Sequence, residues 1–228
     1  MAANIYEILK GEIISGKRRP GEVFEEKVFA GQLGVSRTPV REAVLQLARE
    51  GLLVVMPRRG TMVSNISMED IRQIYEARRI LEPQIMRIVA KRAEKKGLET
   101  WKAFFERQKK QLQEGGELPK FPGETETQIC PDADAAYHLF LAESTGNRYI
   151  LKQMEELMTQ TQRIRNLSNV QRKNRYQASI EEHIRMTEAL QREDGAQAAE
   201  EVLCHLRNSE EGYRKMMLED MSDMIQIY

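Results

Sequence analysis

The stretch LGVSRTPVREAVLQLAREGLLVVMPRRGTMVS, residues 33–64, contains the signals that decide the fold of the N-terminal part of this chain. Gly34 supplies the sharp turn that separates two helices, and Ser36 is an N-cap residue for the second of them. Two short strands rich in β-branched residues follow, Leu52–Met56 and Thr61–Ile66, and a Pro-Arg-Arg-Gly turn joins them. The pattern predicts a helix-turn-helix followed by a β-hairpin wing.

Working outward, the apolar residues before this stretch recur at helical spacing, and the segment GKRRPG ends the first helix. We expect helices at Ile5–Ser15, Glu25–Leu33 and Ser36–Glu50. Residues 1–66 are therefore predicted to form a winged helix-turn-helix domain with three helices.

The helix that begins at Ser36 carries the residues that suit DNA recognition. Arg37 and Arg41 stand four residues apart on one face, whereas Val40 and Val44 lie on the face that packs inward. In the major groove an arginine forms a bidentate pair with guanine, which contributes about 1–3 kcal/mol of discrimination. Taken alone, the two arginines could equally be solvated residues of a helix surface.

Further DNA contacts are predicted around this helix and at the wing. Hydroxyl groups at the helix start suit phosphate oxygens, and a glycine at the wing tip permits close approach of the backbone. These additional candidates are Ser36, Thr38, Arg58, Arg59 and Gly60.

Composition is consistent with this interpretation. The 228 residues are enough for one or two domains, and the formal net charge of zero conceals a split. Residues 1–66 hold ten Lys and Arg against seven Asp and Glu, and the remainder has the opposite balance. No stretch approaches the roughly 20 apolar residues of a transmembrane helix, and the N-terminus lacks a signal-peptide pattern. We expect a cytoplasmic protein that does not bind a membrane.

Beyond the wing, the strand signal disappears and long amphipathic patterns follow. Residues 67–228 are predicted to form an all-α antiparallel bundle of about six helices, with a loop at Gly115–Pro131. The expected helices are Ser67–Lys96, Leu98–Gln113, Asp132–Ser144, Asn147–Leu167, Arg172–Gln191 and Gly195–Met217.

The histidines of the bundle are spaced as metal ligands would be. Asp134 and His138 lie four residues apart, on one face of one helix. His183 and His205 lie on two later helices among apolar residues, so both should face the interior. Any one of the histidines is more readily explained as a core or surface residue. Together the four side chains suit a divalent transition metal with open coordination positions.

The N-terminal segment Leu33–Ala43 resembles the signature of the GntR superfamily of winged-helix regulators. The resemblance covers about residues 4–66 and implies a homodimer on an inverted-repeat operator in double-stranded DNA, with Arg37 and Arg41 contacting bases. The family usually has an apolar residue followed by Ala in the second helix, and Phe29 and Ala30 match this pair. Because acidic residues precede the pair here, Lys27 is the candidate phosphate or base contact from that helix.

The C-terminal part resembles the FCD effector domain of the FadR-like branch of that superfamily. The similar segments are Tyr75–Glu82, Asp134–Asn147 and residues 181–206. In that family the matching Asp and three His bind metal, which implies that Asp134, His138, His183 and His205 hold zinc, nickel or manganese.

Family effectors are commonly small carboxylic or sugar acids that bind beside the metal, and a cation is needed to fix the carboxylate. Arg78 matches the family arginine on the first bundle helix, and Arg163 and Arg165 are further candidates. Each of the three could equally form an ordinary salt bridge, for example Arg78 with Glu82.

The resemblance therefore implies a transcription regulator, a repressor released by its effector, rather than an enzyme. Two alternatives remain open from the sequence. The four ligands could activate water in a helical metalloenzyme, although no general base is identified. The bundle could also be an inert dimerisation domain on a constitutive DNA-binding protein.

Overall fold

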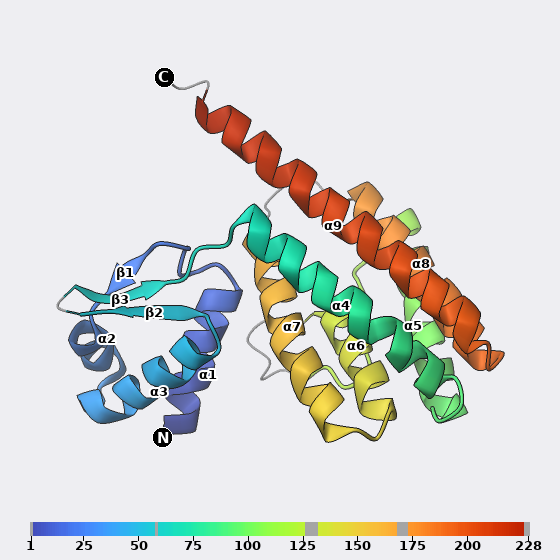
Figure 1. Cartoon of the computed structure of the whole chain (residues 1–228), viewed down its shortest axis with the longest axis horizontal. Coiled ribbons are helices and arrows are strands. Elements are labelled where there is room, and N and C mark those ends of the chain that lie inside the picture. The colour runs from blue at the N-terminus through green and yellow to red at the C-terminus, as the bar shows by residue number, and fades with distance from the viewer. Residues whose placement is uncertain (1, 58, 126–131, 168–172, 226–228) are drawn as a thin grey trace. The chain divides into compact units, whose positions relative to one another are not determined.

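The computed structural model describes residues 2–57, 59–125, 132–167 and 173–225 (Figure 1). The fold is mainly helical with one small sheet, as the sequence predicts. It divides into two compact units, each with its own core. The first unit comprises Met1–Ser67 with Gln162–Leu167, and the second comprises Met68–Thr161 with Ser168–Tyr228.

The first unit is a winged helix-turn-helix. Its helices are α1 (Ala2–Ile14), α2 (Glu26–Leu33) and α3 (Arg37–Arg49), and its strands are β1 (Val23–Phe24), β2 (Leu53–Met56) and β3 (Gly60–Val63). The strands form an antiparallel sheet in the order β1-β3-β2. The sequence did not indicate β1, because two residues are too short to show a strand period. Strand β1 is recognised by its pairing with β3, in which Val23 lies opposite Met62.

The core of this unit explains the helical pattern of its sequence. Leu9 of α1, Val40, Val44 and Leu47 of α3, and Val63 of β3 are fully buried together. Because these residues recur on one face of α3, the opposite face is left for solvent or a partner.

Two glycines are required by this geometry. Gly34 has a φ of 65° at the end of α2, in the left-handed region that residues with a side chain disfavour. Gly60 has a φ of 97°, and a Cβ there would lie 3.0 Å from the carbonyl oxygen of Phe24. Gly60 therefore allows β1 to approach the wing, a structural role in addition to the one predicted from sequence.

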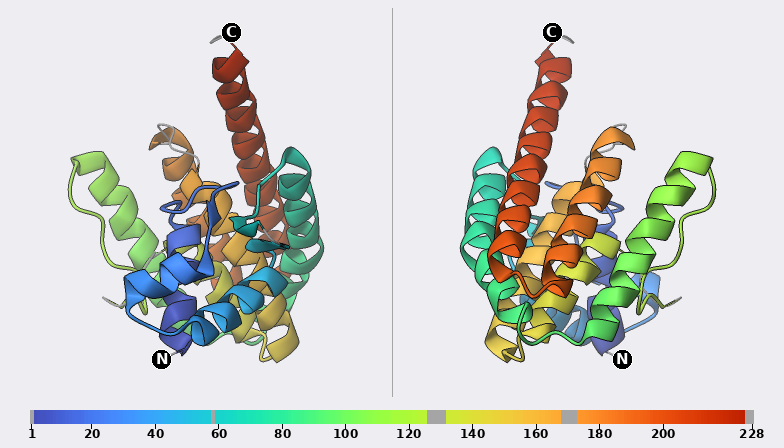
Figure 2. Two further views of the ribbon diagram at one scale, coloured as in Figure 1. Left: turned by 90° about the vertical axis from the view of Figure 1, so that its left-hand side faces the viewer. Right: turned by 90° about the vertical axis from the view of Figure 1, so that its right-hand side faces the viewer.

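The second unit is a bundle of α4 (Met68–Val89), α5 (Lys95–Glu114), α6 (Ala133–Ser144), α7 (Arg148–Leu167), α8 (Lys173–Gln191) and α9 (Gly195–Ile225). Figure 2 shows α4, α9, α8 and α5 side by side in that order, and these neighbours pack against one another. The expected helix Ser67–Lys96 was too long, because the chain turns after Val89 and α5 begins at Lys95. Conversely, α9 continues past Met217 to Ile225.

The end of α7 belongs to the first unit, which the sequence pattern did not indicate. The side-chain amide of Asn166 donates to the carbonyl of Ile14 at 3.0 Å, and Arg163 donates to Ser64. The predicted bundle helix at Asn147–Leu167 therefore supplies residues to both units.

Aromatic and polar groups share the interior of the second unit. Trp101, Phe104 and Phe105 of α5 pack with Tyr137 of α6, with ring centroids between 5.0 and 5.6 Å apart. Next to these rings lie three buried histidines and several buried charged groups. Because buried charges are costly unless they are paired, this polar centre marks the candidate site.

Candidate metal centre and DNA-contacting surface

Three helices bring the four predicted metal ligands together. Asp134 and His138 come from α6, His183 from α8 and His205 from α9, and one potential ligand atom from each lies within 4.8 Å of all the others. The three histidines are at most 2% exposed, and the Asp134 side chain is 16% exposed. Helical spacing aligns Asp134 with His138, and the folding of the bundle adds the other two.

The distances fit one ion at the centre of the group. Nε2 of His183 lies 3.3 Å from Oδ1 of Asp134, and Nε2 of His205 lies 3.7 Å from the same oxygen. Ligand atoms about 2.1 Å from a shared ion lie roughly 3–4 Å from one another. Only small side-chain movements would therefore be needed.

Unpaired buried nitrogens also fit a metal. The Nε2 atoms of His138 and His183 are buried and have no hydrogen-bond partner among the described residues. Burial lowers the pKa of His183 and lowers that of His205 to about 3. Both rings are therefore neutral at physiological pH, which is the form that ligates a metal.

A carboxylate orients His138 from behind. Oε2 of Glu82, on α4, lies 2.8 Å from Nδ1 of His138, so the opposite nitrogen, Nε2, is directed to the cluster. Burial by itself raises the pKa of a carboxyl group, but Arg78 and His138 outweigh it and lower the pKa of Glu82 to about 2. Glu82 is therefore ionised and holds the ring in one orientation.

A second carboxylate orients His205 in the same way. Oε2 of Glu182 lies 2.8 Å from Nδ1 of His205. Arg175 donates to both oxygens of Glu182 at 2.9 and 2.8 Å, and Asn208 donates to one of them at 2.7 Å. Although burial opposes ionisation, His205 and Arg175 lower the pKa of Glu182 to about 2. Two of the three histidines are thus fixed by ionised glutamates.

These supporting residues were only partly visible in the sequence. The spacing of Arg78 and Glu82 indicated a pair, and the structure contains it, but nothing linked that pair to His138. Glu182 precedes His183 in the chain yet orients His205, and no sequence pattern signals such a contact.

Arg78 is the predicted effector-binding residue that the structure places at the cluster. Its Nε donates to Oε1 of Glu82 at 2.6 Å, and the residue is 1% exposed. Burial disfavours its charge, but Glu82, with smaller contributions from Tyr75 and Asp134, raises the pKa of Arg78. One guanidinium nitrogen, Nη2, is buried with no hydrogen-bond partner in the described part of the chain. Arg78 is thus both a salt-bridge residue and a donor with one position open.

The other two predicted effector-binding arginines lie in the first unit. The buried Arg163 uses one nitrogen to donate to Oγ of Ser64 at 2.8 Å and the other to donate to the Ser64 carbonyl. Arg165 is half-buried near the end of α7. The four candidate metal ligands, in contrast, belong to the second unit.

The predicted DNA contacts of α2 and α3 lie on the surface of the first unit. Exposed side chains are found at Lys27, Ser36, Arg37, Thr38 and Arg41. The three cations form no ion pair with any described residue, and the Ser36 hydroxyl makes no capping hydrogen bond. These groups are available to phosphates and base edges.

The wing carries the remaining predicted DNA contacts. Arg58 lies outside the described residues, and Arg59 is exposed beside Gly60 in the turn between β2 and β3.

Among the helices that the structure describes, none has the length and apolar character that a membrane span requires.

Comparison with known families assigns both units. The FCD domain family matches residues 73–208, and the family described as bacterial regulatory proteins, gntR family, matches residues 1–63. Both sets of candidate residues, those on α3 and those of the metal cluster, lie inside these matches.

Individual proteins are similar over nearly the whole chain. The uncharacterized HTH-type transcriptional regulator YdhC of Bacillus subtilis is 28% identical, covering 94% of this chain and 91% of that protein. The HTH-type transcriptional repressor RspR of Escherichia coli is 27% identical, covering 95% and 90%. The solved structure of E. coli McbR/YncC has a TM-score of 0.76 at 18% identity, covering 95% and 98%, and so has the same fold.

Proposed function

Since the chain belongs to the GntR family of bacterial transcription regulators that carry an FCD domain, we propose that it is a repressor that releases its operator when a small carboxylate binds beside a metal ion. The family and the relatives are regulators, not enzymes, so the metalloenzyme alternative is set aside. The observation that carries the proposal is the cluster of four ligand atoms within 4.8 Å beside Arg78.

In the proposed DNA complex, α3 enters the major groove. Arg37 and Arg41 contact base edges there, while Lys27 and the hydroxyls of Ser36 and Thr38 contact phosphates. Arg58, Arg59 and Gly60 of the wing contact the DNA backbone. The unpaired cations on the exposed side of α3 support this assignment.

Charge favours a singly charged carboxylate as the effector. The carboxylates of Asp134, Glu82 and Glu182 exceed the guanidiniums of Arg78 and Arg175 by one negative charge. When bound, a divalent zinc, nickel or manganese ion reverses that charge and offers an open coordination position. One carboxylate then restores neutrality.

Arg78 is the residue that we propose binds this carboxylate. Its unpaired Nη2 is a buried donor, and leaving such a donor unsatisfied costs about 1–3 kcal/mol. An acceptor oxygen from the effector would satisfy it, with the strength of a charge-assisted hydrogen bond. The Nε atom remains on Glu82, which fixes the direction in which the guanidinium points.

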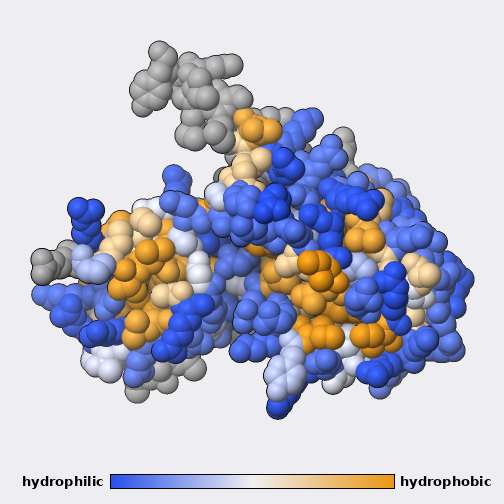
Figure 3. Space-filling view, in the orientation of Figure 1, coloured by the Kyte–Doolittle hydropathy of each residue, from blue (hydrophilic) through white to orange (hydrophobic). Residues whose placement is uncertain are grey.

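We also propose that the protein acts as a homodimer on an inverted repeat, because one winged helix reads only one half-site. The outward face of α4 is the candidate surface in the second unit. Ile80 is 66% exposed, and Ile74, Ala77, Leu81 and Ile88 are half-buried at helical spacing on the same helix. Figure 3 shows apolar side chains gathered over this part of the unit.

The decisive experiment measures operator release by metal-loaded and chelator-treated protein with a panel of hydroxy and sugar acids. The proposal expects release by at least one acid from loaded protein and loss of that response in Arg78→Gln. Thermal shift identifies acids that bind, because a ligand of the folded state raises apparent stability. Operator binding that no acid alters, with or without metal, would instead support a constitutive DNA-binding protein.

A further inference from the structure

A pocket opens on the second unit, and none of the four candidate metal ligands lines it. It has a volume of about 470 Å³ and is formed by α5, α6, α7 and the segment after α5. This volume is typical of sites for small organic molecules. The lining residues are Gly97, Thr100, Trp101, Pro122, Ala136, Leu139, Phe140, Glu143, Leu151 and Glu155.

Helix α6 separates this pocket from the metal cluster. With about 100° of rotation per residue, Leu139 and Glu143 fall on the side of the helix opposite Asp134 and His138. The pocket lining includes none of the four candidate metal ligands. A molecule bound in the pocket would therefore occupy a site of its own.

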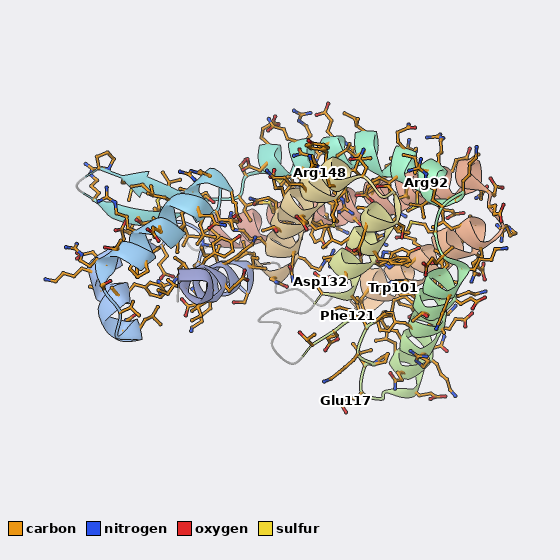
Figure 4. The ribbon with its side chains drawn as sticks, turned by 90° about the horizontal axis from the view of Figure 1, so that it is seen from below. Arg92, Trp101, Glu117, Phe121, Asp132 and Arg148 are labelled. Atoms are coloured by element: carbon orange, nitrogen blue, oxygen red, sulfur yellow. The ribbon has the colours of Figure 1, made fainter. Side chains whose placement is uncertain are left out.

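The floor of the pocket is aromatic. Trp101 and Phe140 both line it, and their ring centroids are 6.0 Å apart. Phe121 stacks on Trp101 with centroids 6.4 Å apart and ring planes 13° apart, and Figure 4 shows the two side chains next to each other. Trp101 is only 3% exposed, so packing fixes the ring in place. Phe140, which is half-buried, therefore supplies most of the apolar surface that the floor offers to a flat group, and Trp101 adds only an edge.

The rim of the pocket is acidic. Glu143 of α6 and Glu155 of α7 are exposed, and neither forms an ion pair with any residue that the structure describes. The pocket lining contains no lysine or arginine. Among neighbouring cations on α7, Arg148 is directed to Tyr149, with a hydrogen bond of 2.9 Å to its hydroxyl. The residues that line the pocket thus include two carboxylates and no cation, and the nearest lysine on α7, the exposed Lys152, forms no ion pair with Glu155 in the described part of the chain.

We infer that this pocket binds a small organic ammonium ion with a flat apolar body. The apolar body packs on Phe140 and on the exposed edge of Trp101, while the ammonium group pairs with Glu143 and Glu155. An acid of the same shape would be repelled by both carboxylates, and a neutral analogue would gain only the apolar contact. The selectivity is therefore opposite to that of the proposed effector site, where a carboxylate binds.

The test uses Trp101 as the reporter, because it is the only tryptophan of the chain and lies in the pocket wall. The full-length protein, metal-loaded and chelator-treated, is titrated with phenethylammonium while tryptophan fluorescence is recorded. The matched probes are 3-phenylpropionate, which is anionic, and 3-phenylpropanol, which is neutral. The inference expects a saturable change with the ammonium probe in both forms of the protein and the weakest binding with the acid.

Variants assign the binding to the rim carboxylates. The double variant Glu143→Gln/Glu155→Gln should bind phenethylammonium about fivefold more weakly, as expected for two solvent-screened pairs. Glu156→Gln is the control, because Glu156 is an exposed neighbour on α7 that does not line the pocket. It should leave the dissociation constant unchanged. The inference is overturned by an absent or non-saturable signal, by equal binding of the acid, or by unchanged affinity in the double variant.

Discussion

Replacing Glu182 by Gln should weaken metal binding without touching a ligand atom. The two oxygens of Glu182 lie within 2.9 Å of four nitrogen atoms, one on His205, two on Arg175 and one on Asn208. All four are donors when His205 ligates through Nε2. Glutamine keeps the shape but turns one oxygen into an NH₂ group, which then faces at least one donor.

The expected magnitude follows from what His205 loses. A carboxylate behind a ligating imidazole fixes its tautomer and raises its basicity, and removing such a partner typically costs 10–100-fold in metal affinity. That factor corresponds to about 1.4–2.8 kcal/mol. Because its pKa is lowered to about 2, Glu182 is ionised at neutral pH, where the assay is run.

The assay is a competition titration of zinc between the protein and a chelator of known affinity, with metal content checked by elemental analysis. Glu181→Gln is the matched control, because Glu181 is the neighbouring residue and its partner Lys109, at 3.0 Å, lies at the surface. Its affinity should change less than twofold. If Glu182→Gln folds, as shown by circular dichroism, and binds zinc within twofold of the wild type, the positioning role is wrong.

Four other outcomes are expected. Arg37→Ala and Arg41→Ala should each lower operator affinity by about 1–3 kcal/mol in gel-shift titrations and spare binding to random DNA. His183→Ala should reduce metal content in elemental analysis while operator binding persists. Ile80→Asp should convert dimer to monomer in light scattering, because a buried unpaired carboxylate is costly. In denaturation of metal-free protein, the free energy of unfolding should fall as the pH drops from about 6.5 towards 3, because the unfolded chain takes up a proton that buried His205, with its pKa lowered to about 3, resists.

The sequence predicted those parts of the fold that have a local signal, and it missed those that depend on contacts between distant residues. Gly34, the N-cap at Ser36 and the β-branched hairpin are local signals, and the helices and wing they predict are present. The end of α4 at Val89 was missed, because residues 90–94 lack a glycine or proline that would announce the turn. The docking of residues 162–167 in the first unit depends on contacts with residues about 100 or more positions away, which periodicity cannot express.

The candidate site likewise has residues whose proximity the sequence predicted and others that only the folded chain brings together. Asp134 and His138 share a helix face by spacing, so their proximity was predictable. That His183 and His205 join them depends on how α8 and α9 pack, and the resemblance to a family supplied it. The glutamates behind the histidines come from α4 and α8, and their partners are 56 and 23 positions away in sequence, so only the folded chain shows them.

The polar cluster is better explained by ligand binding than by stability. Burying the carboxylates of Glu82 and Glu182 and the guanidinium of Arg78 removes their hydration, and well-packed apolar residues in their place often leave a protein equally or more stable. Yet the cluster also keeps atoms without partners, the Nε2 atoms of His138 and His183 and Nη2 of Arg78. Native cores satisfy nearly all such atoms, so three unsatisfied ones in one place require a reason. A metal ion would supply the missing partner of the two imidazole nitrogens, and a carboxylate would supply that of the guanidinium nitrogen. Each of the two ligands therefore completes what the other leaves open, and we expect each to bind more tightly in the presence of the other.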